Sequence, residues 1–162
     1  MNIFESIFRH FNNAKIKYLV AGGVAVNLHG FVRFTGDLDI LVLLEEKNLE
    51  RLDQLMKKIG YIERIPVSVP ELKDNKKVKK WLKEKNLKAY SFIPPKNSLL
   101  QIDIIIEESL KFSQFDRKKI VKKIDNVNIS VICLDDLIKM KKKANRDQDI
   151  FDLKSLIELK NL

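Results

Sequence analysis

The sequence contains very little cysteine and histidine, and it has no long hydrophobic run. A single cysteine, Cys133, cannot form an internal disulfide, and no basic and then apolar leader opens the chain, so we expect a cytoplasmic protein. Two histidines and one cysteine offer too few ligands for a zinc site. No apolar stretch approaches the roughly 20 residues that a membrane helix needs. A membrane protein is therefore not expected.

Basic residues clearly exceed acidic ones. The chain has 31 Lys and Arg against 22 Asp and Glu, a formal net charge of +9. This excess favours polyanionic partners such as nucleotides or RNA, although a compositional bias of the source genome would produce it too. Much of the surplus lies in residues 73–88, which we interpret as a solvated helix face, with a nucleic-acid patch as the alternative.

The hydrophobic pattern alternates between helical and extended spacing along the 162 residues, a length that suits one domain. Apolar residues three and four apart predict helices, and short apolar runs predict strands. The predicted helices are 2–13, 24–28, 48–59, 75–84, 135–143 and 147–159, and the predicted strands are 18–21, 37–44, 88–93, 99–106, 118–124 and 127–132. This order predicts an α/β (α+β) fold: one domain over 1–162 with a mixed β-sheet of about four or five strands, flanked by helices, and a C-terminal helical pair (134–159).

Two aspartates, Asp37 and Asp39, stand one residue apart at the start of an apolar run that continues to Leu44. Because a strand alternates its faces, both carboxylates should project from the same face. Like charges so close repel each other, and burial of either is unfavourable without a partner. A bound cation resolves both problems, and Mg²⁺ prefers carboxylate oxygens that it shares with substrate phosphates.

A third aspartate, Asp103, interrupts another apolar segment, residues 100–105. If this segment pairs beside the strand of Asp37 and Asp39, the three carboxylates converge. Such a triad can hold two divalent ions, Mg²⁺ or Mn²⁺, between a triphosphate and an attacking hydroxyl. Any one of these aspartates alone would more simply lie in solvent or form a salt bridge, but the three together favour a metal site.

Two glycines, Gly22 and Gly23, follow a predicted strand and precede a predicted helix. Backbone N–H groups at such a junction can hold a phosphate, although tight turns use Gly-Gly for other reasons as well. Arg33 and Thr35 flank the aspartate strand. Arg33 could neutralise charge on a leaving pyrophosphate or could be an exposed loop residue, and Thr35 could shape the turn or contact a carboxylate.

The C-terminal pair carries a lysine that the helical spacing turns inward. Lys141 shares a stripe with Leu137, so it needs an anion, either a nucleotide phosphate or Asp149. For the last helix we expect Ile150, Leu153 and Ile157 to face inward. Its acidic residues, Asp149 and Asp152, are then interpreted as structural partners of the nearby cations, namely Lys141, Arg146 and Arg33.

Together these segments resemble the nucleotidyltransferase superfamily that includes DNA polymerase β. The resemblance is to its small prokaryotic branch, which is similar to abortive-infection toxins and lincosamide nucleotidyltransferases. It covers residues 18–44 and 99–157. The motifs that carry it are Gly22-Gly23, Arg33-x-Thr35-x-Asp37-x-Asp39, the single Asp103, and Lys141 followed by Arg146-x-x-Asp149-x-x-Asp152-Leu153.

The resemblance implies an enzyme of the EC 2.7.7 type that transfers a nucleoside monophosphate from an NTP to a hydroxyl and releases pyrophosphate. It implies that Asp37 and Asp39 bind two Mg²⁺ (or Mn²⁺) ions, and that Asp103 binds the catalytic ion and helps to deprotonate the acceptor. Nucleotide contacts would come from the glycines and from flanking basic or polar residues, namely Gly22, Gly23, Arg33, Thr35, Lys141 and Arg146. The acceptor stays open between tRNA or another RNA, a small molecule and a protein.

The alternative is a catalytically silent nucleotide-binding or antitoxin-like interaction module of the same fold. The intact set of three acidic residues favours the enzyme, because buried carboxylates are costly to retain without a use. A toxin–antitoxin or RNA-modifying setting is consistent with the resemblance. Neither the preferred NTP nor the oligomeric state follows from the sequence.

Overall fold

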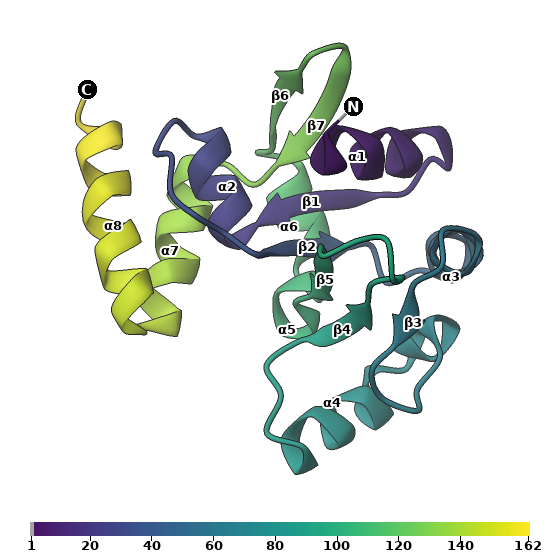
Figure 1. Ribbon diagram of the computed structural model, residues 1–162. Helices are drawn as coiled ribbons and strands as arrows, with labels where there is room; N and C mark the ends of the chain where they lie inside the picture. The colour runs from purple at the N-terminus through teal and green to yellow at the C-terminus, as the bar shows by residue number, and fades with distance from the viewer. Residues whose placement is uncertain (1) are drawn as a thin grey trace.

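A mixed seven-stranded sheet forms the centre of the computed structural model, which describes residues 2–162 (Figure 1). Its strands lie in the order β3-β4-β5-β2-β1-β7-β6. Their bounds are β1 Tyr18–Ala21, β2 Asp37–Val42, β3 Ile62–Glu63, β4 Tyr90–Ile93, β5 Gln101–Ile104, β6 Ile120–Ile124 and β7 Val127–Val131. The two strands that carry the acidic residues, β2 and β5, are neighbours in the middle of the sheet.

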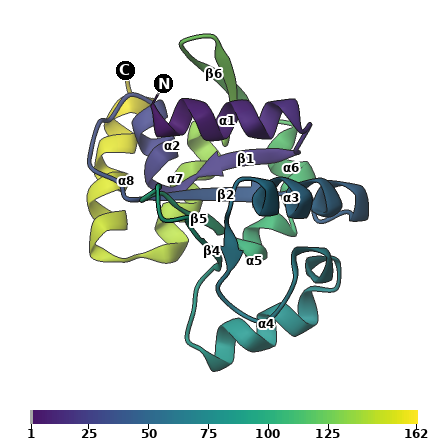
Figure 2. The same ribbon diagram turned by 45° about the vertical axis from the view of Figure 1, so that its right-hand side comes forward.

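Helices surround the sheet. They are α1 Ile3–Asn13, α2 Gly22–Leu28, α3 Glu46–Lys58, α4 Asn75–Glu84, α5 Ile106–Ser109, α6 Phe112–Asp116, α7 Leu134–Ala144 and α8 Asp147–Lys160, with a 3₁₀ helix η1 at Val69–Lys73. Figures 1 and 2 both show α7 and α8 packed side by side next to α2, while α3 lies at the other end of the central strands. The two C-terminal helices, α7 and α8, thus stand beside the sheet.

The first helix shows how the sequence builds the core. Asn2 caps α1 by accepting a hydrogen bond from the backbone N of Glu5 at 2.7 Å, which satisfies one of the free N–H groups of the first turn. Phe8 and Phe11 are fully buried, and their ring centroids lie 5.9 and 5.1 Å from that of Tyr18 on β1. The apolar stripe of α1 is thus fixed to the strand that leads into Gly22.

The sheet has more strands than the four or five that the sequence predicts. β3 contributes only two residues, too few to give a periodic pattern. The hairpin of β6 and β7 joins the sheet through a short parallel pairing in which Val20 is opposite Val131, a contact that local sequence does not specify. The second helix also begins earlier than predicted, at Gly22 rather than at residue 24.

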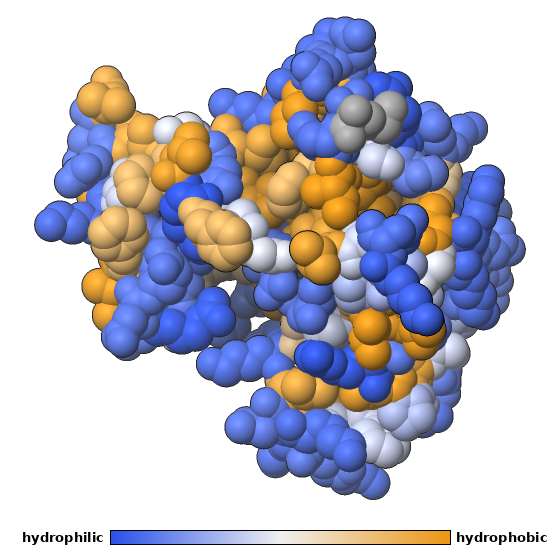
Figure 3. Space-filling model, in the orientation of Figure 1, coloured by the Kyte–Doolittle hydropathy of each residue, from blue (hydrophilic) through white to orange (hydrophobic). Residues whose placement is uncertain are grey.

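The inward face of α8 differs from the prediction. Ile150 and Ile157 are exposed, and Leu153 is only partly buried, whereas Asp149, Asp152 and Leu156 are buried. The acidic residues of α8 face inward because they form ion pairs there. Lys141 on α7 contacts Asp149 and Asp152, and Arg33 contacts Asp152 as well. In Figure 3, hydrophobic side chains accordingly appear on the outer surface over α8.

Hydrophobic helices of membrane-spanning length are absent from residues 2–162.

Candidate active site

The carboxylates of Asp39 and Asp103 lie side by side on the sheet. β2 and β5 are parallel, and their register places Asp39 opposite Asp103 and Asp37 opposite Gln101. Opposed residues of paired strands point to the same face, and Asp37 shares that face because it is two residues from Asp39. The expected pairing of the two acidic strands is confirmed, so the backbone brings the three predicted acidic residues together.

Burial and mutual repulsion make this carboxylate row difficult to ionise. Burial raises the pKa of Asp39 most, the charges of Asp103 and Asp37 raise it further, and the pKa reaches about 7 despite the opposing effect of Lys141 and Arg146. The pKa of Asp37 is also raised, first by burial and then by Asp103. A bound cation would remove the repulsion that raises both values.

The donor set suits a hard divalent cation, since it consists of carboxylate oxygens on one face. In residues 2–162, however, no three Asp, Glu, His or Cys side chains already enclose a common point. Gln101, for example, donates a hydrogen bond from Nε2 to Oδ1 of Asp103 at 3.0 Å. Rotation of the side chains toward one another is therefore needed before an ion can be shared.

Gly22 and Gly23 lie directly against the functional side chains. A Cβ atom at Gly22 would lie 2.1 Å from Oδ2 of Asp39, and Gly22 has a positive φ of 60°. A Cβ atom at Gly23 would lie 2.7 Å from Oγ1 of Thr35 and 2.8 Å from Nη2 of Arg33. Glycine is thus required at both positions by close approach of other side chains.

Substitution of Gly22 by Ala should damage the site more than a generic glycine substitution. The new methyl group would displace the Asp39 carboxylate, and the positive φ adds strain, so we expect destabilisation by about 1–3 kcal/mol together with weaker Mg²⁺-dependent nucleotide binding. Thermal unfolding and nucleotide titration measure the two effects. Gly36→Ala is the control, because no atom lies within 4 Å of a Cβ there. Equal behaviour of the two variants would contradict the contact with Asp39.

The lysine of the C-terminal signature is held in a buried ion cluster between α7 and α8. Lys141 Nζ lies 2.9 Å from Oδ1 of Asp149 and 3.0 Å from Oδ2 of Asp152. Arg33 donates from Nη2 to Oδ2 of Asp152 at 2.9 Å. Arg146 donates from Nε to Oδ2 of Asp149 at 2.7 Å. The predicted structural role of both acidic residues is confirmed by these contacts.

The same cluster shows which anions its cations contact. Of the two anions considered for Lys141, the structure places Asp149 beside it and adds Asp152. Arg33 is not a free loop residue, since its Nε forms an ion pair with Oδ1 of Asp152 on α8 at 2.8 Å. Although burial alone would raise it, the pKa of Asp149 falls to about 2 because Arg146 and Lys141 donate hydrogen bonds to its carboxylate. Thr35 contacts the backbone O of Asp37 through Oγ1 at 3.3 Å.

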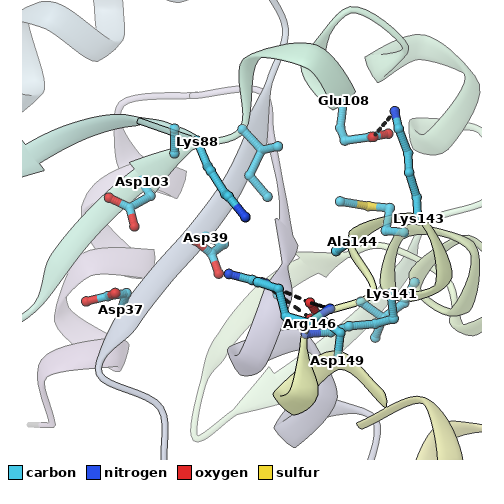
Figure 4. Close-up of a pocket in the computed structure, with 15 residues that line it drawn as sticks. Asp37, Asp39, Lys88, Asp103, Glu108, Lys141, Lys143, Ala144, Arg146 and Asp149 are labelled. Carbon is cyan, nitrogen blue, oxygen red and sulfur yellow. Dashed lines mark hydrogen bonds and ion pairs between the residues drawn. The ribbon is translucent and has the colours of Figure 1, made fainter. Parts of the chain in front are cut away.

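A cavity of about 470 Å³ opens between the carboxylate row and α7 (Figure 4). One wall is apolar, from Ile105, Leu137, Met140 and Ala144. The other lining residues are small or charged, namely Gly22, Asp37, Asp39, Lys88, Ala89, Asp103, Glu108, Lys141, Lys143, Arg146 and Asp149. A cavity lined by carboxylates, by cations and by apolar side chains suits a nucleotide.

Two basic lining residues were missed by the sequence reasoning. Lys88 belongs to the basic run that we interpreted as a solvated helix face, yet it follows α4 and points into the cavity (Figure 4). Lys143 is exposed, and its Nζ lies 3.1 Å from Oε1 of Glu107 and of Glu108. The only available signal for Lys88 was its position at the start of the predicted strand 88–93.

Solved structures of similar fold come from several nucleotidyltransferases. The lincomycin-bound lincosamide antibiotic adenylyltransferase LnuA matches with a TM-score of 0.61 and 16% identity over 96% of this chain and 95% of that one. An antigenic nucleotidyltransferase-like protein from Paracoccidioides brasiliensis also has a TM-score of 0.61, with 13% identity over 95% and 73% of the two chains. At such identities the likeness establishes the shared fold.

Sequence comparison gives the family. A search of curated proteins found no match. The family model of the nucleotidyl transferase AbiEii toxin of type IV toxin–antitoxin systems matches residues 7–162, a range that includes the carboxylate row, the glycine pair and the C-terminal ion cluster. The chain therefore belongs to the AbiEii nucleotidyl transferase toxin family.

Proposed function

We propose that this protein is a metal-dependent nucleotidyltransferase that moves a nucleoside monophosphate from an NTP to a hydroxyl group of an acceptor. The observation that carries the proposal is the register of β2 and β5, which sets Asp39 beside Asp103 and Asp37 on the same face. The raised pKa values of Asp37 and Asp39 support it, because the nearby cations do not offset the burial and the mutual repulsion of these carboxylates. Two Mg²⁺ or Mn²⁺ ions, held by Asp37, Asp39 and Asp103, would supply that charge and activate the phosphate.

The reaction follows from these positions. The acceptor oxygen would attack the α-phosphorus of the NTP, and the bond from that phosphorus to the bridging oxygen would break, releasing pyrophosphate. Asp103, on the β5 side of the row, would take the proton of the attacking hydroxyl. The backbone of Gly22 and Gly23 would hold the triphosphate, with Lys141 and Arg146 as further nucleotide contacts.

The apolar wall of the cavity supports a place for the ribose and base. Leu137 and Met140 on α7 face the carboxylate row across the cavity, so a nucleotide could pack against α7 while its phosphates reach the acidic residues. This arrangement gives α7 a direct role in substrate binding, besides its role in the ion cluster.

Labelling with each radioactive NTP in turn tests the proposal. Purified protein, Mg²⁺ and a cell lysate should yield a labelled acceptor, and the class of molecule that carries the label identifies the acceptor. Asp37→Ala should abolish the labelling, whereas Asp116→Ala, which removes a surface partner of Lys119 on α6, should not. Labelling that survives in Asp37→Ala would refute the metal site.

An RNA acceptor is tested separately by salt dependence. Binding to tRNA through lysines should weaken steeply as salt rises, because each phosphate contact releases counterions. The net charge of +9 supports this choice. A failure to bind tRNA at any salt concentration would exclude it and leave a small molecule or a protein as the acceptor.

A further inference from the structure

Lys88 lines the cavity just before β4, the strand that pairs with the strand of Asp103. It stands two residues before β4, which pairs with β5 so that Tyr90 is opposite Ile104. Ala89 and Ile105 line the cavity beside it, and Figure 4 shows its side chain extending into the space above Asp39. Its anchor is therefore the central sheet itself, although its long side chain is exposed.

Lys88 differs in one respect from the other cations of the cavity. Lys141 contacts Asp149 and Asp152, Arg146 contacts Asp149, and Lys143 contacts Glu107 and Glu108. Across residues 2–162, by contrast, no carboxylate forms an ion pair with Lys88. Its charge is thus the one that a ligand in the cavity can use without breaking an existing contact.

We propose that Lys88 binds a phosphate group of the nucleotide, an inference that rests on the proposed function. A triphosphate and the three carboxylates of the row together carry more negative charge than two divalent ions offset, and the triphosphate would lie in the cavity that Lys88 enters. An ammonium group on a flexible stem suits this role because it binds phosphate as a point charge without fixed geometry. Lys88 would then hold the phosphates from the β4 side, in the cavity that Arg146, the residue before α8, also lines.

A neighbouring groove offers a competing source of phosphate. Lys88 also borders a space of about 670 Å³ between α4 and α5, together with Lys79, Lys83 and Lys111. A phosphate of the acceptor, lying in that groove, would meet the same ammonium group. A probe with neither a base nor an acceptor, such as inorganic tripolyphosphate, distinguishes a phosphate of the nucleotide from a phosphate of the acceptor.

The experiment measures the affinity of the full chain for inorganic tripolyphosphate and for ATP, each with Ca²⁺ to prevent turnover. Lys88→Ala should weaken both by about tenfold, the effect of one charge-assisted hydrogen bond, and Lys88→Arg should restore most of the loss. Lys85→Ala is the matched control. It removes a lysine of the same basic run that lies over the ring of Trp81, 5.6 Å from its centroid, and does not line the cavity.

Three other outcomes would overturn the inference. Unchanged affinity of Lys88→Ala for both probes, with slower transfer to the acceptor, would assign Lys88 to the acceptor. A loss for ATP alone would assign it to the base or ribose. An equal loss in Lys85→Ala would reduce the effect to general surface charge. If the wild-type chain binds neither probe, the proposed function itself fails, and the assignment of Lys88 fails with it.

Discussion

Asp39→Asn is expected to abolish nucleotidyl transfer and, at the same time, to stabilise the metal-free fold at pH 8. The carboxylate of Asp39 is half-buried beside Asp103 and close to Asp37. Asn retains the shape of the side chain and removes the charge that its surroundings oppose. A residue that raises stability when it is replaced, yet is needed for activity, is typical of a functional site.

The sign and size of the effect follow from the pKa of Asp39. It is about 7 in the folded chain against 3.8 in a model peptide, so the folded state binds more protons than the unfolded state between about pH 4 and pH 7. Stability therefore falls as pH rises through this range. Above pH 7 the penalty is complete, on the order of 4 kcal/mol, or about 10 °C in the unfolding temperature of a chain of this size.

Thermal unfolding of both proteins across pH 3–8 measures this prediction. The difference in unfolding temperature should be absent below about pH 4 and greatest above pH 7. Mg²⁺ should raise the unfolding temperature of the wild-type chain but have little effect on Asp39→Asn. A variant that is less stable than wild type at pH 8 would contradict the repulsion in the carboxylate row.

Asp152→Ala is expected to have the largest effect on folding. Asp152 is fully buried and contacts both Arg33 and Lys141, so its loss leaves two cations with too little negative charge around them. Removal of one member of a buried ionic network typically costs about 3–5 kcal/mol. The loop that carries Arg33 should also detach from α8, which would alter the surroundings of Gly23.

Chemical denaturation and proteolysis of the loop measure these two consequences. Asp135→Ala is the matched control, because Asp135 pairs with Lys160 on the exposed surface and should change stability by no more than about 0.5 kcal/mol. Comparable losses in both variants would mean that the buried cluster contributes no more than a surface pair. Loss of nucleotide binding without loss of stability would instead assign Asp152 to the substrate site.

The candidate site was predictable from the sequence to an unusual degree because its signals are local. Asp37 and Asp39 share a face by strand alternation, and Gly22 and Gly23 mark a junction between strand and helix. That the strand of Asp103 pairs with the strand of Asp37 and Asp39 was a hypothesis, since local periodicity does not predict which distant segments pair. The register of β2 and β5 confirmed it.

Other features escaped the sequence because they depend on contacts between distant residues. The spacing of apolar residues on α8 predicted that Ile150 and Ile157 would be buried. Instead Asp149 and Asp152 are buried, because they form ion pairs with Lys141 and Arg33. Lys88 was placed at the end of the basic run of residues 73–88 and at the start of the predicted strand 88–93. Only the pairing of β4 with β5 brings it to the cavity.

The sequence alone determined the kind of chemistry, because carboxylates at alternate positions of a strand and a glycine pair before a helix are properties of the local chain. The tertiary structure decided which charges remain free for a substrate. Lys141, Arg146 and Arg33 form ion pairs with Asp149 and Asp152, while Lys88 forms none within the part of the chain that the structure describes. The packing of helices and strands against each other decides which charged residues come into contact. The spacing of residues along the sequence does not predict that packing.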